Sequence, residues 1–160
     1  MLYIEFLILL SFLVPASIID CKTKHIPNAI SFSFMAIGLI WNIVFDIDNL
    51  IFNAIAVFLI FIFGYFRFMG LGDIKMLMGI ALFLGWQYAL CSLIFGSVLL
   101  LFYSLVFHFT HLKSAVRGFV NAIKYKHLYL LRTGKSFPFM IFISIGCIGY
   151  YLIDYFSTLV

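Results

Sequence analysis

Charged side chains are scarce in this sequence. They make up 10% of its 160 residues, whereas hydrophobic residues make up 66% and the mean hydropathy is +1.20. A soluble domain carries about 25% charged residues, so the composition excludes an ordinary soluble domain and favours lipid as the solvent. Since the chain leaves no room for a large soluble domain beside its apolar runs, we expect a single membrane-embedded domain over residues 1–160.

The sequence also lacks the patterns of several functional classes. Its three cysteines, Cys21, Cys91 and Cys147, are widely separated and form no Cys-x-x-Cys pair, which argues against a zinc site or a disulfide framework. No His-Glu-x-x-His spacing occurs, so we expect neither a metal nor a cofactor. A phosphate-binding glycine loop and a basic, aromatic-interleaved groove are missing too. We therefore expect no nucleic-acid partner, and we assign the basic residues to loops that contact membrane lipid.

Long apolar runs dominate what is present. They predict an all-α polytopic membrane protein with six transmembrane helices, at residues 2–19, 28–45, 50–68, 74–85, 88–109 and 137–156. The fourth run is short, since a span needs about 20 residues. Residues 112–131 place apolar side chains at helical spacing among lysines and arginines. That pattern predicts an amphipathic helix in the cytoplasmic interface, with a role in substrate handling as the alternative.

The basic residues predict the topology. All ten fall between, or at the facing ends of, the first and second, third and fourth, or fifth and sixth runs, which lie on one side if six helices cross the membrane. The positive-inside rule makes that side cytoplasmic and places both termini outside. No cationic region precedes the first run, so we expect a retained anchor rather than a cleaved signal peptide. The expected location is the cytoplasmic (inner) membrane.

Two aspartates stand out among the six acidic residues. Only Asp20 and Asp73 share segments with basic residues, and each lies where an apolar run meets a polar turn on the predicted cytoplasmic side. Two carboxyls about 3 Å apart cannot both ionise, so one can activate water while the other, neutral, polarises a peptide carbonyl. We therefore predict that they are the catalytic dyad of an aspartic protease. The helix dipoles favour an ionised Asp73 and a protonated Asp20.

The motifs around these acids resemble those of the type IV prepilin peptidases, which are polytopic aspartic proteases of the Gly-x-Gly-Asp kind. The first motif, Asp-x-Lys/Arg-x-x-x-Ile-Pro-Asn, is matched by Asp20, Lys22, Ile26, Pro27 and Asn28. The second, Gly-x-Gly-Asp-x-Lys, is matched by Gly70, Gly72, Asp73 and Lys75. The two glycines are expected to allow a sharp turn and a close substrate approach, with simple helix packing as the alternative.

The resemblance implies that the leader peptide of a prepilin or pseudopilin is cut at the cytoplasmic face, while the substrate's hydrophobic helix stays in the bilayer. Many bacterial members also carry an N-terminal domain with paired Cys-x-x-Cys motifs and methylate the trimmed pilin. This sequence shows no such motifs, so we expect peptidase activity without methyltransferase activity. It also departs from the family after Phe137-Pro138-Phe139, where Met140-Ile141 replaces an expected Gly-Pro.

Two other classes remain as hypotheses. A small ion-coupled transporter or proton channel would also use carboxylates in a membrane, although it would favour acids near mid-span. A non-catalytic assembly subunit would tolerate replacement of either aspartate. The sequence leaves open which prepilin is cut and which oligomeric state the protein adopts.

Overall fold

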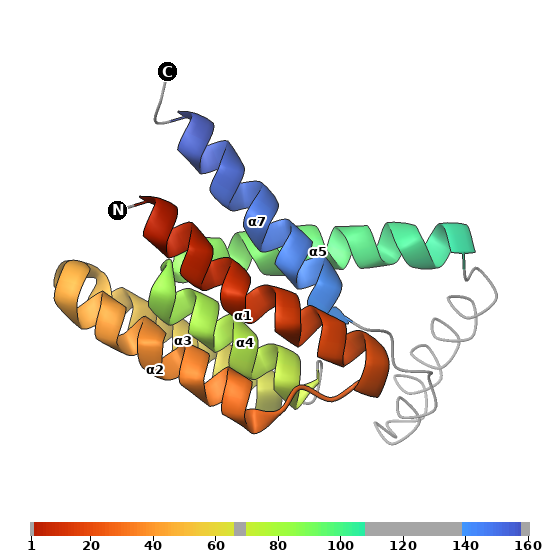
Figure 1. Ribbon diagram of the computed structural model, residues 1–160, viewed down its shortest axis with the longest axis horizontal. Helices are drawn as coiled ribbons and strands as arrows, with labels where there is room; N and C mark the ends of the chain where they lie inside the picture. Colours follow the sequence, from red (N-terminus) through yellow and green to blue (C-terminus); the bar gives the residue numbers. More distant parts are fainter. Residues whose placement is uncertain (1, 66–69, 108–138, 158–160) are drawn as a thin grey trace, which may run out of the picture.

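The regular structure is entirely helical in the part of the chain that the computed structural model describes, residues 2–65, 70–107 and 139–157. In chain order the elements are α1 (Leu2–Thr23), α2 (Asn28–Phe45), the 3-10 turn η1 (Ile47–Asn49), α3 (Leu50–Tyr65), α4 (Leu71–Phe83), α5 (Trp86–Phe107) and α7 (Phe139–Ser157) (Figure 1). No strand occurs in those ranges, which confirms the all-α prediction there. The expected interfacial helix at residues 112–131 lies outside the described residues.

Membrane-spanning length is reached by five helices in the described ranges. The qualifying segments, by length and apolar composition, are α1, α2, η1 together with α3, α5 and α7. Their outer faces expose large apolar side chains such as Phe58, Phe61 and Phe102, as expected of surfaces in contact with lipid. α4 has 13 residues and reaches only about 20 Å, less than the roughly 30 Å of a bilayer's hydrocarbon core. The chain is thus a membrane protein with several spans.

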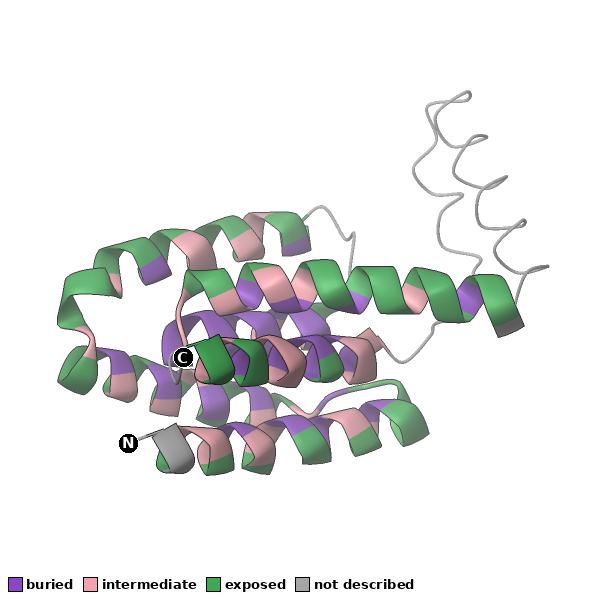
Figure 2. Cartoon of the chain, turned by 90° about the horizontal axis from the view of Figure 1, so that it is seen from above, coloured by how far each residue is buried: buried purple, intermediate pink, exposed green. Residues whose placement is uncertain are grey.

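The short helix α4 forms the centre of the molecule. It packs against α2, α3 and α5. Ten of its residues are buried, including every residue from Met76 to Phe83 (Figure 2). A helix that is apolar on all sides is stable where protein surrounds it. The apolar run that looked marginal as a span is therefore a core helix in contact with neighbouring helices.

Glycines allow two helix pairs to approach closely. A Cβ placed on Gly38 of α2 would lie 3.0 Å from the backbone nitrogen of Phe83 in α4. A Cβ placed on Gly146 of α7 would lie 3.2 Å from the backbone nitrogen of Gly96 in α5. Small residues at such crossings let backbones pack directly, which is how helices associate where lipid removes the hydrophobic driving force.

Two buried amides hold the turn between α4 and α5. Gly85 takes a φ of +106°, a conformation that favours glycine. The Asn42 side chain donates a hydrogen bond to the Leu82 carbonyl (3.2 Å), and the Asn53 side-chain oxygen accepts one from the Trp86 N–H (3.0 Å). α2 and α3 thus fix the end of α4 and the start of α5.

The first and last described helices run in opposite directions. At one end of the bundle the rings of Phe6 and Tyr151 stack with centroids 5.5 Å apart. At the other end Asp20 of α1 bonds to Met140 of α7. The predicted end of the first helix at residue 19 is wrong by one turn, because α1 continues to Thr23. Asp20 therefore lies inside the last turn of a helix.

Candidate active site

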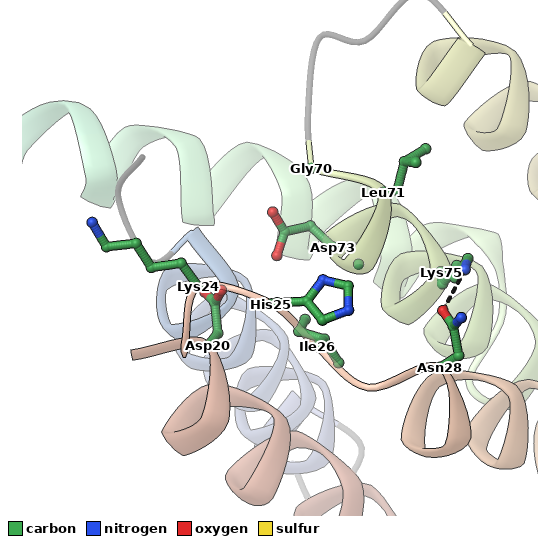
Figure 3. A pocket seen from close by; sticks show the side chains of 10 residues that line it. Asp20, Lys24, His25, Ile26, Asn28, Gly70, Leu71, Asp73 and Lys75 are labelled. Atoms are coloured by element: carbon green, nitrogen blue, oxygen red, sulfur yellow. Dashed lines mark hydrogen bonds between the residues drawn. The ribbon is translucent and has the colours of Figure 1, made fainter. Parts of the chain in front are cut away.

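Both predicted motifs meet at one end of the bundle. A pocket of about 440 Å³ opens there (Figure 3). Seven of the nine residues singled out from the sequence line it: Asp20, Ile26, Asn28, Gly70, Gly72, Asp73 and Lys75. The other two do not: Lys22 is exposed on the last turn of α1, and Pro27 immediately precedes α2. Residues 50 positions apart in the sequence thus share one cavity.

Asp20 projects from the last turn of α1 and is 7% exposed. One carboxyl oxygen, Oδ2, accepts a hydrogen bond of 3.1 Å from the backbone N–H of Met140. Met140 is the second residue of α7, where backbone N–H groups have no partner within their own helix. The Asp20 carboxylate thus satisfies one of the unpaired donors at the start of another helix.

Asp73 lies in the first turn of α4, outside the candidate membrane spans, and is 9% exposed. Burial, with a smaller contribution from the negative charge of Asp20, raises the pKa of Asp73 from its ordinary value to about 7. The described residues supply no hydrogen bond to its carboxyl group. Its environment therefore favours the neutral acid.

The surroundings of the two acids include influences that the dipole argument made from the sequence left out. That argument predicted an ionised Asp73, because it considered only the helix that carries each acid. Asp20 instead receives a donor from the positive end of α7. At Asp73 burial is the largest influence on the pKa, and it favours the neutral acid.

The loop between α1 and α2 brings two further side chains to the pocket. Lys24 adopts a φ of +53°, in the left-handed region, and its N–H bonds to the Asp20 carbonyl at 2.8 Å. This conformation ends α1 and turns the chain so that His25 also lines the pocket. The Thr23 hydroxyl lies 2.8 Å from the His25 carbonyl and supports the turn. Lys24 and His25 had not been assigned to the site, since a left-handed lysine has no sequence signature.

The motif glycines act by leaving room rather than by turning. A Cβ on Gly72 would lie 3.1 Å from the Ile26 Cβ, so the buried Ile26 packs directly on the start of α4. A Cβ on Gly70 would lie 2.9 Å from Asp73 Oδ2 and would displace that carboxyl group. Gly70 has an ordinary φ of −62°, which any residue can adopt, so its backbone conformation does not itself require glycine.

Lys75 binds the start of α2. Its Nζ donates a hydrogen bond of 2.7 Å to Asn28 Oδ1 and lies 4.8 Å from the centroid of the Phe32 ring (Figure 3). The cation is therefore directed toward α2. This contact joins the last residue of the first motif to the last residue of the second.

Comparisons with known proteins agree with the motifs. The model of the type IV leader peptidase family matches residues 7–105, which include both aspartates. A curated relative, the prepilin leader peptidase/N-methyltransferase of Pectobacterium carotovorum subsp. carotovorum, is 28% identical over 88% of this chain and 48% of its own length. The chain thus spans about half the length of that relative. No solved structure matches the chain.

Proposed function

The chain belongs to the type IV leader peptidase family, and on that premise we propose that it is an aspartic endopeptidase that removes the leader of type IV prepilins or pseudopilins. One observation carries the proposal: two buried carboxyls from separate motifs, Asp20 and Asp73, line the same pocket. Buried acids are costly unless they are paired or functional, and acids in a cleft with shifted pKa values are typical of catalytic sites.

The proposed chemistry uses the two carboxyls in opposite protonation states. The ionised one takes a proton from a water molecule, whose oxygen attacks the scissile carbonyl carbon. The neutral one donates its proton to the carbonyl oxygen, which gives a tetrahedral diol. When the diol collapses, the first carboxyl returns its proton to the leaving amine as the C–N bond breaks. The second recovers a proton from the diol, and both regain their starting states.

The membrane setting fits a substrate that carries its own apolar helix. We propose six passes of the chain through the protein, five of them by helices of spanning length and the sixth by the short, protein-enclosed α4, with both termini outside and the pocket at the cytoplasmic face of the inner membrane. The described basic residues agree with that orientation, because Lys24 and Lys75 line the pocket and Lys22 lies beside it. We propose one peptidase domain over residues 1–160 and no methyltransferase activity for this chain. The transporter hypothesis is not favoured, because the family is one of peptidases.

The test is cleavage in a purified system. The detergent-solubilised chain is mixed with a prepilin-like peptide that has a basic leader and an apolar helix, and leader release is followed by mass spectrometry. Asp20→Asn and Asp73→Asn should each lower the cleavage rate by at least about a hundredfold, as expected for loss of an acid–base group. Asp48→Asn, which changes an exposed acid in η1, is the matched control and should leave the rate unchanged.

Thermal unfolding of every variant would show that inactive proteins are still folded. Cleavage that survives both site substitutions, or that is stopped by metal chelators, would falsify the dyad mechanism.

A further inference from the structure

The N–H groups at the start of α7 meet the end of α1 at the pocket. Asp20 has an unfavourable place on its own helix, because the C-terminal end of a helix dipole is negative and disfavours an anion. Its carboxyl group nevertheless accepts the Met140 N–H at 3.1 Å. Asp20 thus serves α7 as an N-capping acid does, although it comes from a different helix.

The contact is held in place by its neighbours. The hydroxyls of Ser17 in α1 and Ser144 in α7 lie 2.8 Å apart, one turn along each helix from the Asp20–Met140 pair. The Ser144 hydroxyl also donates to the Met140 carbonyl at 2.9 Å. Met140 and Ser144 are both buried. The donor therefore has a fixed position relative to the carboxylate, as electrostatic preorganisation requires.

No comparable support reaches the second acid. Asp73 is buried against Gly70, and the described residues offer its carboxyl group no donor. The charged and titratable groups that share the pocket with the two acids are Lys24, His25 and Lys75. Lys75 is bound to Asn28, and the described first turn of α7 carries no acidic residue.

We propose that the first turn of α7 is a positioning element for the dyad: the Met140 N–H favours the ionised form of Asp20 over that of Asp73, so that Asp20 is the base that activates water. Asp73 is then the neutral acid that protonates the substrate carbonyl. This inference rests on the proposed peptidase function. Because the donor is a backbone group, the Met140 side chain is replaceable.

Removing one N–H tests the proposal. Met140→Pro deletes the donor at a position in the first helical turn, where proline is tolerated. Met140→Ala keeps the donor and is the matched control for the lost side chain. An amide-to-ester substitution at residue 140 removes the same N–H without a proline ring, so it replaces Met140→Pro if that variant does not fold.

Two measurements test how the loss of the Met140 N–H affects the ionisation of Asp20. In the cleavage assay the acid limb of the pH profile should move upward by roughly one pH unit in Met140→Pro relative to Met140→Ala, since one hydrogen bond to a charged group is lost. In an Asp73→Asn background, a 13C-detected titration of the Asp20 carboxyl should show a midpoint shift of similar size. Met140→Ala, compared with the protein that keeps Met140, should show a negligible shift in either measurement.

The experiments distinguish a failure of the proposed α7 role from a failure of the proposed peptidase function. Coincident titration curves for Met140→Pro, the ester variant and Met140→Ala would overturn the role of α7. The titration needs no cleavage, so a protein that cuts no prepilin peptide but shows the shifted Asp20 midpoint would disprove the peptidase and leave the α7 contact established.

Discussion

Lys75 Nζ donates a 2.7 Å hydrogen bond to Asn28 Oδ1, which ties the N-terminal part of α4 to the first residue of α2. A second link between the same segments is the packing of Ile26 on Gly72. Both links lie beside the pocket, and both join the two motifs that supply the acids. Lys75 and Asn28, the polar residues that end the two motifs, can therefore act by holding Asp73 in place, since neither bonds to a dyad carboxyl group.

The Lys75–Asn28 bond should show measurable coupling. Lys75→Met and Asn28→Ala should each destabilise the protein, and the double variant should lose less than the sum of the two. Because the pair is exposed, the coupling energy should be about 0.5–1 kcal/mol. Thermal unfolding of the four proteins in detergent measures it. Strict additivity would show that the two side chains do not interact in solution.

The left-handed conformation of Lys24 gives a second prediction. Its φ of +53° costs a residue with a Cβ about 1 kcal/mol, and glycine avoids that cost. Lys24→Gly should therefore raise the unfolding temperature relative to Lys24→Ala, although both remove the same charge. Equal unfolding temperatures for these two variants would mean that the loop relaxes out of this conformation.

The close packing between α2 and α4 gives a third prediction. Gly38→Ala would place a Cβ 3.0 Å from the Phe83 backbone, which cannot rotate away, so the helices must separate. The expected cost is about 1–3 kcal/mol. Gly149→Ala is the control, because nothing lies within 4 Å of its Cβ position in α7 and alanine favours helix. The two substitutions should move the unfolding temperature in opposite directions, and shifts of the same sign would contradict the packing argument.

The hydrophobic pattern predicted most of the helices but could not distinguish lipid from protein. Residues 28–45 were expected as a helix, and α2 has those bounds. For α4, an apolar run indicates only an apolar environment, and a membrane interior and a protein core are both apolar. The burial of Asp73 follows from this central position of α4, so the sequence could name the residue without giving its protonation.

Backbone features were the part of the site that the sequence could not show. The Met140 N–H is a donor that every residue except proline carries, so no residue type marks it. The left-handed Lys24 replaces the glycine that usually ends a helix in this way. By contrast, Asp20, Asn28 and Lys75 were found because their side chains carry the chemistry. Side-chain motifs were predictable, and the backbone groups that orient them were not.

Asp73 should make stability depend on pH. Its pKa is about 7 in the folded protein and near the ordinary value of 3.8 in the unfolded chain. Between these values the folded state binds the proton and the unfolded state does not. The stability that protonation provides is complete below about pH 4, and it is lost as pH rises through about 7. The total change is on the order of a few kcal/mol.

The comparison that isolates this effect is the unfolding temperature of the unmodified protein minus that of Asp73→Asn, measured from pH 4 to pH 8. The difference should fall steadily with rising pH, because the amide cannot ionise and has no such dependence. Asp20→Asn should reduce the slope, since the charge of Asp20 contributes to the raised pKa of Asp73. Asp48→Asn, an exposed acid in η1, should leave the slope unchanged. A difference that is constant with pH would mean that Asp73 is hydrated and ionised in the folded protein, and the neutral acid of the proposed dyad would be lost with it.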